Sequence, residues 1–162
     1  MLIQRPQDFG IGRGQIFVGG SWVDSAGSDR REIFDPKDES AVDAVAAGTT
    51  EDADRAVAAA RKAQPAWAAL TPMERAGLLQ KLANLVDENN EVLAQMLTAE
   101  GGKLLSESRI DAGFCAALLR YAAESARRLQ GEILPGEGHD EQIWIQRVPY
   151  GVVAGGVVAG IG

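Results

Sequence analysis

Apolar positions recur along this chain with two different spacings. Over residues 15–23 they alternate with polar positions around Gly19-Gly20, which predicts a β-hairpin with a tight glycine turn. Ile33-Phe34 and residues 41–47 (AVDAVAA) predict two more short strands. Near Thr49 the spacing changes to i, i+3, i+4, i+7, which is typical of amphipathic helices. The pattern therefore predicts strands first and helices afterwards.

Four helices are predicted after this change. The first is capped by Thr49 or Thr50 and is expected to end at Pro65. The second opens with Thr71-Pro72-Met73-Glu74, a capping box with proline at the first helical position. The third covers about residues 91–100 and the fourth about residues 106–130, each followed by glycine. The apolar stripes expected to be buried are Leu78, Leu79, Leu82, Leu85 and Val86, then Val92, Leu93, Met96 and Leu97, then Ile110, Phe114, Leu118 and Tyr121.

The two ends of the chain differ from this helical region. Residues 1–14 are polar and glycine-rich, and we expect a loose N-terminal arm there. Residues 15–140 hold the hairpin and the four helices. In residues 141–162, a strand is predicted over 142–148 (QIWIQRV), followed by a glycine-rich tail in which GVVAG occurs twice in tandem. The fold class predicted is α/β, rich in helix, with one late strand.

Composition excludes several classes of partner. The net charge is −7 with both signs interspersed, so the chain lacks the basic patch that nucleic acid requires. The longest apolar stretch, residues 151–162, is too short and too rich in glycine to span a membrane. No secretory signal is recognisable at the N-terminus, and a single cysteine permits no intrachain disulfide. These features favour a cytoplasmic protein.

Three short elements occur in a characteristic order. They are the turn Asp35-Pro36-Lys37-Asp38, the segment Glu100-Gly101-Gly102-Lys103 and the strand start Pro149-Tyr150-Gly151-Val152. With QIFVGGSWVDS and LLRYAAESARRLQGEILPG, they make nearly the whole chain resemble the N-terminal part of the aldehyde dehydrogenase superfamily. The Glu-Gly-Gly-Lys variant and the Ala-Arg-Arg before Gly-Glu-Ile resemble lactaldehyde and glycolaldehyde dehydrogenases most.

The resemblance implies an activity and an assembly for the full-length parent. The parent would oxidise a small aldehyde to a carboxylic acid with NAD or NADP and form a homo-oligomer, with the strand at 142–148 in an oligomerisation sheet whose partner strand lies far downstream. In the family, the segment matching residues 151–161 leads into Pro-Trp-Asn, whereas here Ile161 is followed by Gly162. The dinucleotide-binding domain is therefore expected to be incomplete. We expect no catalytic residue in this chain, and no cofactor bound to it.

Individual side chains have competing interpretations. Cys115 lies within FCAALL and is interpreted as a small core residue, not as a nucleophile. By resemblance, Asp111 and Phe114 border the substrate tunnel; the alternative is a solvated carboxylate and an ordinary core ring. Glu100 and the backbone of Ile33 match positions that hold a monovalent cation in some relatives; the alternative is a glutamate at a helix end. His139 is interpreted as a solvated loop residue.

Three functions remain open at this point. The chain is part of an oxidoreductase, a non-catalytic assembly module whose late strand pairs with a partner's sheet, or a truncation product without function. A continuing reading frame that encodes Pro-Trp-Asn would favour the enzyme.

Overall fold

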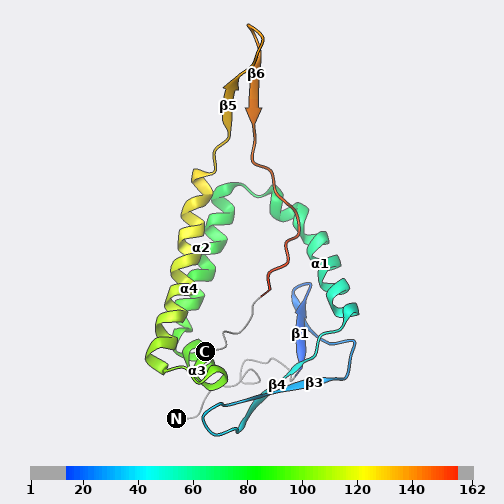
Figure 1. Ribbon diagram of the computed structural model, residues 1–162, viewed down its shortest axis with the longest axis vertical. Coiled ribbons are helices and arrows are strands. Elements are labelled where there is room, and N and C mark those ends of the chain that lie inside the picture. The colour runs from blue at the N-terminus through cyan, green and yellow to red at the C-terminus, as the bar shows by residue number, and fades with distance from the viewer. Residues whose placement is uncertain (1–13, 157–162) are drawn as a thin grey trace.

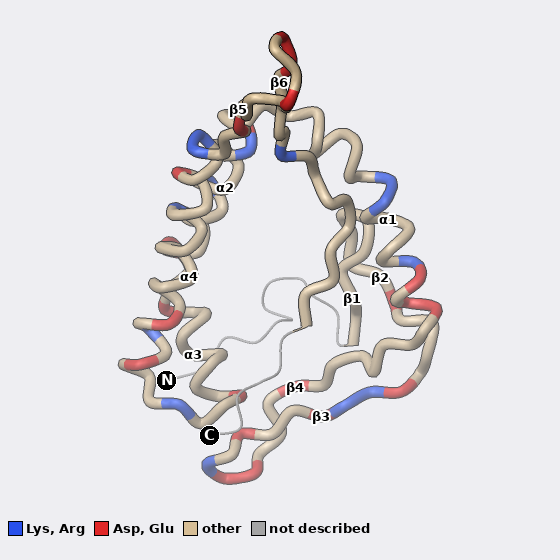
Figure 2. Tube along the Cα trace, turned by 45° about the horizontal axis from the view of Figure 1, so that its top comes forward, with Lys and Arg blue, Asp and Glu red and all other residues tan. Residues whose placement is uncertain are grey.

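The computed structural model describes residues 14–156. Its helices form the left and upper right sides of an open frame, with β-hairpins below and above them (Figure 1, Figure 2). The predicted arm, apart from Gly14, and most of the second GVVAG copy lie outside the described residues. The elements are β1 (Gln15–Val18), β2 (Ser21–Asp24), β3 (Arg30–Phe34), β4 (Ala41–Ala46), α1 (Thr50–Ala69), α2 (Pro72–Glu88), α3 (Asn90–Gly101), α4 (Leu105–Ser125), the short 3₁₀ helix η2 (Ala126–Arg128), β5 (Glu132–Pro135) and β6 (Gln142–Ile145).

The first two hairpins confirm the strands predicted before Thr49. β1 pairs antiparallel with β2 around Gly19 and Gly20, whose φ angles of 63° and 88° are the left-handed values that a two-residue hairpin turn requires. Phe17 and Trp22 face each other across the pair, with ring centroids 5.3 Å apart. β3 pairs antiparallel with β4.

Asp52 fastens the start of α1 to the chain after β2. It completes the capping box with Thr49 and is almost fully buried. Its carboxylate accepts hydrogen bonds from Ser25 Oγ at 2.6 Å, from the Ala26 amide at 2.9 Å and from the Thr49 amide at 2.9 Å. These bonds, that from Ser25 foremost, hold the pKa of Asp52 well below its ordinary range. The helix start is thus fixed to a loop some 25 residues earlier.

The prediction that α1 ends at Pro65 is wrong. The helix continues through Pro65 to Ala69 and ends at Leu70, immediately before the Thr71 cap of α2. Proline removes one backbone donor from the helix, so the Arg61 carbonyl loses its usual partner. Both residues are exposed, so water can satisfy that carbonyl, and the alanine-rich flanks favour helix on either side. The Thr71 capping box of α2 is confirmed.

The helices α2, α3 and α4 pack through small side chains. α2 and α4 lie antiparallel and side by side, and α3 joins them at one end (Figure 1). Thr98 Oγ1 donates to the fully buried Ser108 Oγ at 3.0 Å, and the Arg109 guanidinium binds both oxygens of Glu91. The buried apolar residues are all alanines: Ala83, Ala94, Ala99, Ala112, Ala116 and Ala123.

Much of the predicted burial is therefore wrong. The periodicity locates apolar faces correctly, but within residues 14–156 the buried positions are alanines and the bulkier side chains of the same helices are exposed. The large side chains of the predicted stripes that remain exposed are Leu78, Leu82, Leu85, Leu97, Ile110, Phe114, Leu118 and Tyr121. The chain exposes 12353 Å² in total. A compact monomer of this mass exposes about 7,800 Å².

The last part of the described chain is a third hairpin. α4 stops at Ser125, shorter than predicted, and η2 leads into β5, which the sequence analysis missed. β5 pairs antiparallel with β6, so the late strand has a neighbour on one edge that the sequence analysis did not predict. β6 itself ends at Ile145, before the predicted Val148. The hairpin projects beyond the helices (Figure 1). No helix within residues 14–156 is long and apolar enough to cross a membrane.

Candidate functional site

Two of the short elements singled out in the sequence meet in space. Gly102 caps the C-terminus of α3 with a left-handed φ of 68°, and it lies against the turn between β3 and β4. A Cβ atom at residue 102 would stand 2.7 Å from Cγ of Pro36. Only glycine satisfies both the backbone angle and this contact. The Glu100–Lys103 segment is thereby held on the Asp35-Pro36 turn.

This contact brings Glu100 close to the β3–β4 hairpin. Asp43 on β4 is buried, with 8% of its surface exposed, and lies opposite Ile33 of β3 in the strand register. Partial burial raises the pKa of Glu100, and the negative charge of Asp43 raises it further. The site thus gathers two carboxylates beside the backbone of Ile33. Oxygen donors of this kind suit a hard cation, which would also relieve the repulsion between the carboxylates.

A protein site for a transition metal needs more ligands than this one offers. Within residues 14–156 no group of three or more histidine, cysteine, aspartate or glutamate side chains is placed to hold a metal ion. Glu100 and Asp43 supply two carboxylates, which is fewer side-chain ligands than a transition-metal site uses. Sequence reasoning found Glu100 and Ile33 but missed Asp43, because nothing in AVDAVAA distinguishes it from a solvated strand residue.

Asp111 and Phe114 lie on α4, one turn apart. The Asp111 carboxylate forms an ion pair with Lys103, the last residue of the Glu-Gly-Gly-Lys segment, and raises the pKa of Lys103. Both side chains of this pair are about half exposed. The Phe114 ring is 62% exposed within the described residues. The carboxylate and the ring thus remain open to whatever covers this face of α4.

The interpretation of Cys115 as a core residue is also wrong. Its side chain is exposed, because the buried face of α4 runs through Ala112 and Ala116 and residue 115 lies about 80° around the helix from the centre of that face. His139 is exposed in the turn between β5 and β6, as expected. Cys115 lies within α4, whereas His139 lies in the turn of the β5–β6 hairpin, which projects beyond the helices (Figure 1).

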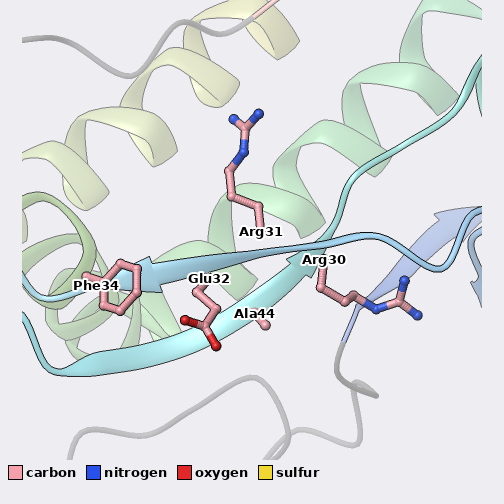
Figure 3. Close-up of a pocket in the computed structure, with 5 residues that line it drawn as sticks. All are labelled: Arg30, Arg31, Glu32, Phe34 and Ala44. Atoms are coloured by element: carbon pink, nitrogen blue, oxygen red, sulfur yellow. The ribbon is translucent and has the colours of Figure 1, made fainter.

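One surface hollow invites an anion-binding interpretation that the geometry does not support. It is lined by β3 and β4 and has a volume of about 790 Å³. Arg30 and Arg31 both line it, but they are consecutive strand residues and their guanidinium groups point to different sides of the sheet (Figure 3). Arg30 is moreover occupied by the Gly27 and Asp29 carbonyls, at 3.3 and 3.1 Å.

The family model described as "Aldehyde dehydrogenase family" matches residues 22–157. This chain belongs to the aldehyde dehydrogenase family.

Individual relatives agree with that assignment. The chain is 33% identical over 141 residues to 3,6-anhydro-alpha-L-galactose dehydrogenase from Vibrio sp. (strain EJY3), a match that covers 87% of this chain and 29% of the relative. The solved lactaldehyde dehydrogenase from Escherichia coli superposes with a TM-score of 0.79 at 31% identity, over 82% of this chain and 28% of that one. A Staphylococcus aureus betaine aldehyde dehydrogenase solved with NAD⁺ gives 0.74 at 32% identity, over 80% and 26%.

The family assignment confirms the resemblance inferred from the sequence, including its N-terminal character. This aldehyde dehydrogenase chain spans about 30% of the length of its curated relatives. The helix–strand frame of residues 14–156 corresponds to the same share of the solved structures. Its α/β fold class is confirmed, with helices predominating over short antiparallel strands.

Proposed function

We propose that this chain supplies the N-terminal helical layer of an NAD(P)-dependent enzyme that oxidises a small aldehyde to a carboxylic acid. The observation that supports this most is the family match over residues 22–157 together with the superposition of 82% of this chain on a solved lactaldehyde dehydrogenase. In the proposed reaction, a thiolate would add to the aldehyde carbonyl, the nicotinamide would accept the hydride, and water would hydrolyse the resulting thioester to release the carboxylic acid and the thiol. We assign the thiolate and the nucleotide site to the part of the parent that corresponds to the remaining length of the relatives.

The described residues do not fit a dinucleotide themselves. All sheets within residues 14–156 are two-stranded antiparallel hairpins. A dinucleotide fold needs parallel strands joined by helices, with a helix N-terminus facing the pyrophosphate. In the proposed reaction, the nucleotide therefore binds to a part of the parent other than these residues. Its proposed contributions are scaffold, one wall of the substrate tunnel at Asp111 and Phe114, and a cation site at Glu100 and Ile33.

The uncovered face of α4 supports the proposed tunnel wall. Phe114 is exposed next to the Lys103–Asp111 ion pair, so an apolar surface lies beside a charged rim. An aromatic ring limits the size of an aldehyde by shape, while the carboxylate and ammonium attract or exclude charged substituents at the mouth. We also propose a homo-oligomer, since the β5–β6 hairpin is exposed on both faces. A cytoplasmic location is proposed from the sequence features given above.

Two experiments test this function. In the first, the purified 162-residue chain, given a panel of small aldehydes with NAD or NADP, should form no reduced cofactor. Reduction that disappears in Cys115→Ser would contradict the assignment of the thiolate elsewhere.

In the second experiment, residues 22–157 replace the matched segment of the Escherichia coli lactaldehyde dehydrogenase. The chimera should reduce NAD with a small aldehyde, and a folded chimera that binds NAD without turnover would exclude the proposed role. Phe114→Ala in the chimera should raise KM for the smallest aldehydes, with Tyr121→Ala as the matched control.

A further inference from the structure

The two methionines within residues 14–156 differ in accessibility. Met73 lies in the first turn of α2, directly after Pro72, and 49% of its surface is exposed. Met96 lies in α3 and is only partly exposed. Peroxides oxidise the thioether of methionine to a sulfoxide, and they must reach the sulfur to do so. Met73 is therefore the methionine of this pair that an oxidant reaches more readily.

A guanidinium from a distant part of the chain contacts the Met73 thioether. Arg127 Nε donates a hydrogen bond to Met73 Sδ, across 54 residues of sequence. Arg127 belongs to η2, which packs against α2 just before the chain enters the β5–β6 hairpin (Figure 1). A thioether sulfur is only a weak acceptor. Within residues 14–156, Arg127 forms no ion pair with a carboxylate, so this weak bond is its one polar contact there.

Oxidation would give Arg127 a stronger acceptor. A hydroperoxide transfers one oxygen atom to Sδ: the O–O bond breaks, an S–O bond forms, the sulfur loses two electrons, and hydrogen peroxide is reduced to water. The sulfoxide oxygen is polar and accepts hydrogen bonds well, and bonds from a charged donor are about twice as strong as neutral ones. Because Met73 is half exposed, the S–O group can form this bond without being buried.

We propose that Met73 is an oxidation site for peroxides, and that Arg127 binds the sulfoxide oxygen that results. Methionine oxidation in a core disrupts packing, because a polar group enters an apolar environment. At Met73 the effect is the reverse, since the guanidinium already contacts the atom that is oxidised. The modification strengthens the link between the start of α2 and η2, and so holds the base of the β5–β6 hairpin more firmly.

Selective oxidation is measured first. The 162-residue chain carrying Cys115→Ser, which removes the competing thiol, is treated with limiting hydrogen peroxide and its peptides are analysed by mass spectrometry. The Met73 peptide should gain one oxygen several-fold faster than the Met96 peptide, which serves as the internal reference. Oxidation of Met96 at the same rate as Met73, or faster, overturns the assignment of the site.

Thermal unfolding then tests the role of Arg127. In a Cys115→Ser, Met96→Leu background, peroxide treatment should raise the melting temperature by about 2–4 °C, the shift expected for a gain of one strong hydrogen bond in a chain of this length. Adding Met73→Leu should abolish the rise.

The matched pair of variants is Arg127→Gln and Arg128→Gln in that same background. Each removes one positive charge from η2, but only Arg127 contacts Met73. The rise should disappear in Arg127→Gln and persist in Arg128→Gln. A melting temperature that falls or stays constant when Met73 is oxidised, or a rise that survives in Arg127→Gln, overturns the proposal.

Discussion

Gly102 lies so close to Pro36 that a methyl group added at residue 102 would stand 2.7 Å from the proline Cγ. The backbone of Gly102 is also left-handed, with φ at 68°. Gly102→Ala should therefore lower the free energy of unfolding by about 2 kcal/mol in urea titrations. Gly77→Ala is the matched control, since Gly77 lies in α2 with no atom within 4 Å of the added carbon. That control should stabilise the chain by up to about 1 kcal/mol, and equal effects of the two substitutions would contradict the packing described.

Asp52 makes the stability of α1 depend on pH. Asp52→Asn should lower the melting temperature at pH 7, because the amide cannot replace the carboxylate that accepts from Ser25, Ala26 and Thr49. Because the pKa of Asp52 is lower in the folded than in the unfolded chain, this stabilisation is complete above about pH 4 and is lost as pH falls further. The two melting curves should therefore converge in acid. Asp54→Asn, at an exposed position on the same helix, is the matched control and should leave the melting temperature at pH 7 close to that of the unmodified chain.

Enlarging Ala83 should destabilise the chain more than truncating Leu82, although loss of a leucine side chain usually costs more stability than a change at alanine. Ala83 is fully buried where α2 meets α4, so Ala83→Leu should cost about 1–3 kcal/mol through overpacking. Leu82 is 46% exposed, and Leu82→Ala should cost less than about 1 kcal/mol. Chemical denaturation of both variants checks the prediction. A larger loss for Leu82→Ala would show that the leucine stripe is covered in the isolated chain.

The proposed cation site predicts a specific effect of salt. At constant ionic strength, replacing choline with potassium should raise the melting temperature of the chain at pH 7, and Glu100→Gln should remove most of that rise. Without potassium, Glu100→Gln should itself be stabilising at pH 7, since the raised pKa means that the folded chain disfavours the ionised carboxyl. This gain should disappear as pH falls below about 4.5. Equal potassium effects on both proteins would exclude the site.

Cys115 should behave as a surface thiol. Because the side chain is exposed on α4, Ellman's reagent should titrate it fully in the native chain, with little acceleration in urea. Cys115→Ser should abolish the reaction. A native thiol that reacts only after unfolding would support the core interpretation that the structure contradicts.

The sequence predicts local structure here better than burial. Thr71 and Glu74 specify the start of α2 by hydrogen bonds within one turn, and Gly19-Gly20 specifies a hairpin turn by its backbone angles, so neighbouring residues suffice for both predictions. Pro65 misleads because its cost depends on exposure of the Arg61 carbonyl, which is a tertiary property. The strand β5 was missed because its pairing depends on residues ten positions later.

In the candidate site, too, features that depend on contacts between distant residues could not be predicted from the sequence. Resemblance drew attention to Glu100 and Ile33, yet Asp43 enters only through the pairing of β3 with β4. Periodicity showed that Phe114 and Leu118 share a face of α4, but it does not reveal which neighbour covers that face. Alanine, which carries the weakest hydropathy signal among the apolar residues of these helices, marks where the helices meet.

The alanine core has a calorimetric consequence. The heat-capacity increment and the urea dependence of unfolding both scale with the surface that becomes exposed, chiefly the apolar surface. In this chain most of the large apolar side chains of α2 and α4 already face water before unfolding begins: Leu78, Leu82, Leu85, Ile110, Phe114, Leu118 and Tyr121. We therefore expect an unfolding transition that is broad in temperature, with a shallow denaturant slope for a protein of this length. The heat-capacity increment and the denaturant slope should both increase when a partner covers these helices.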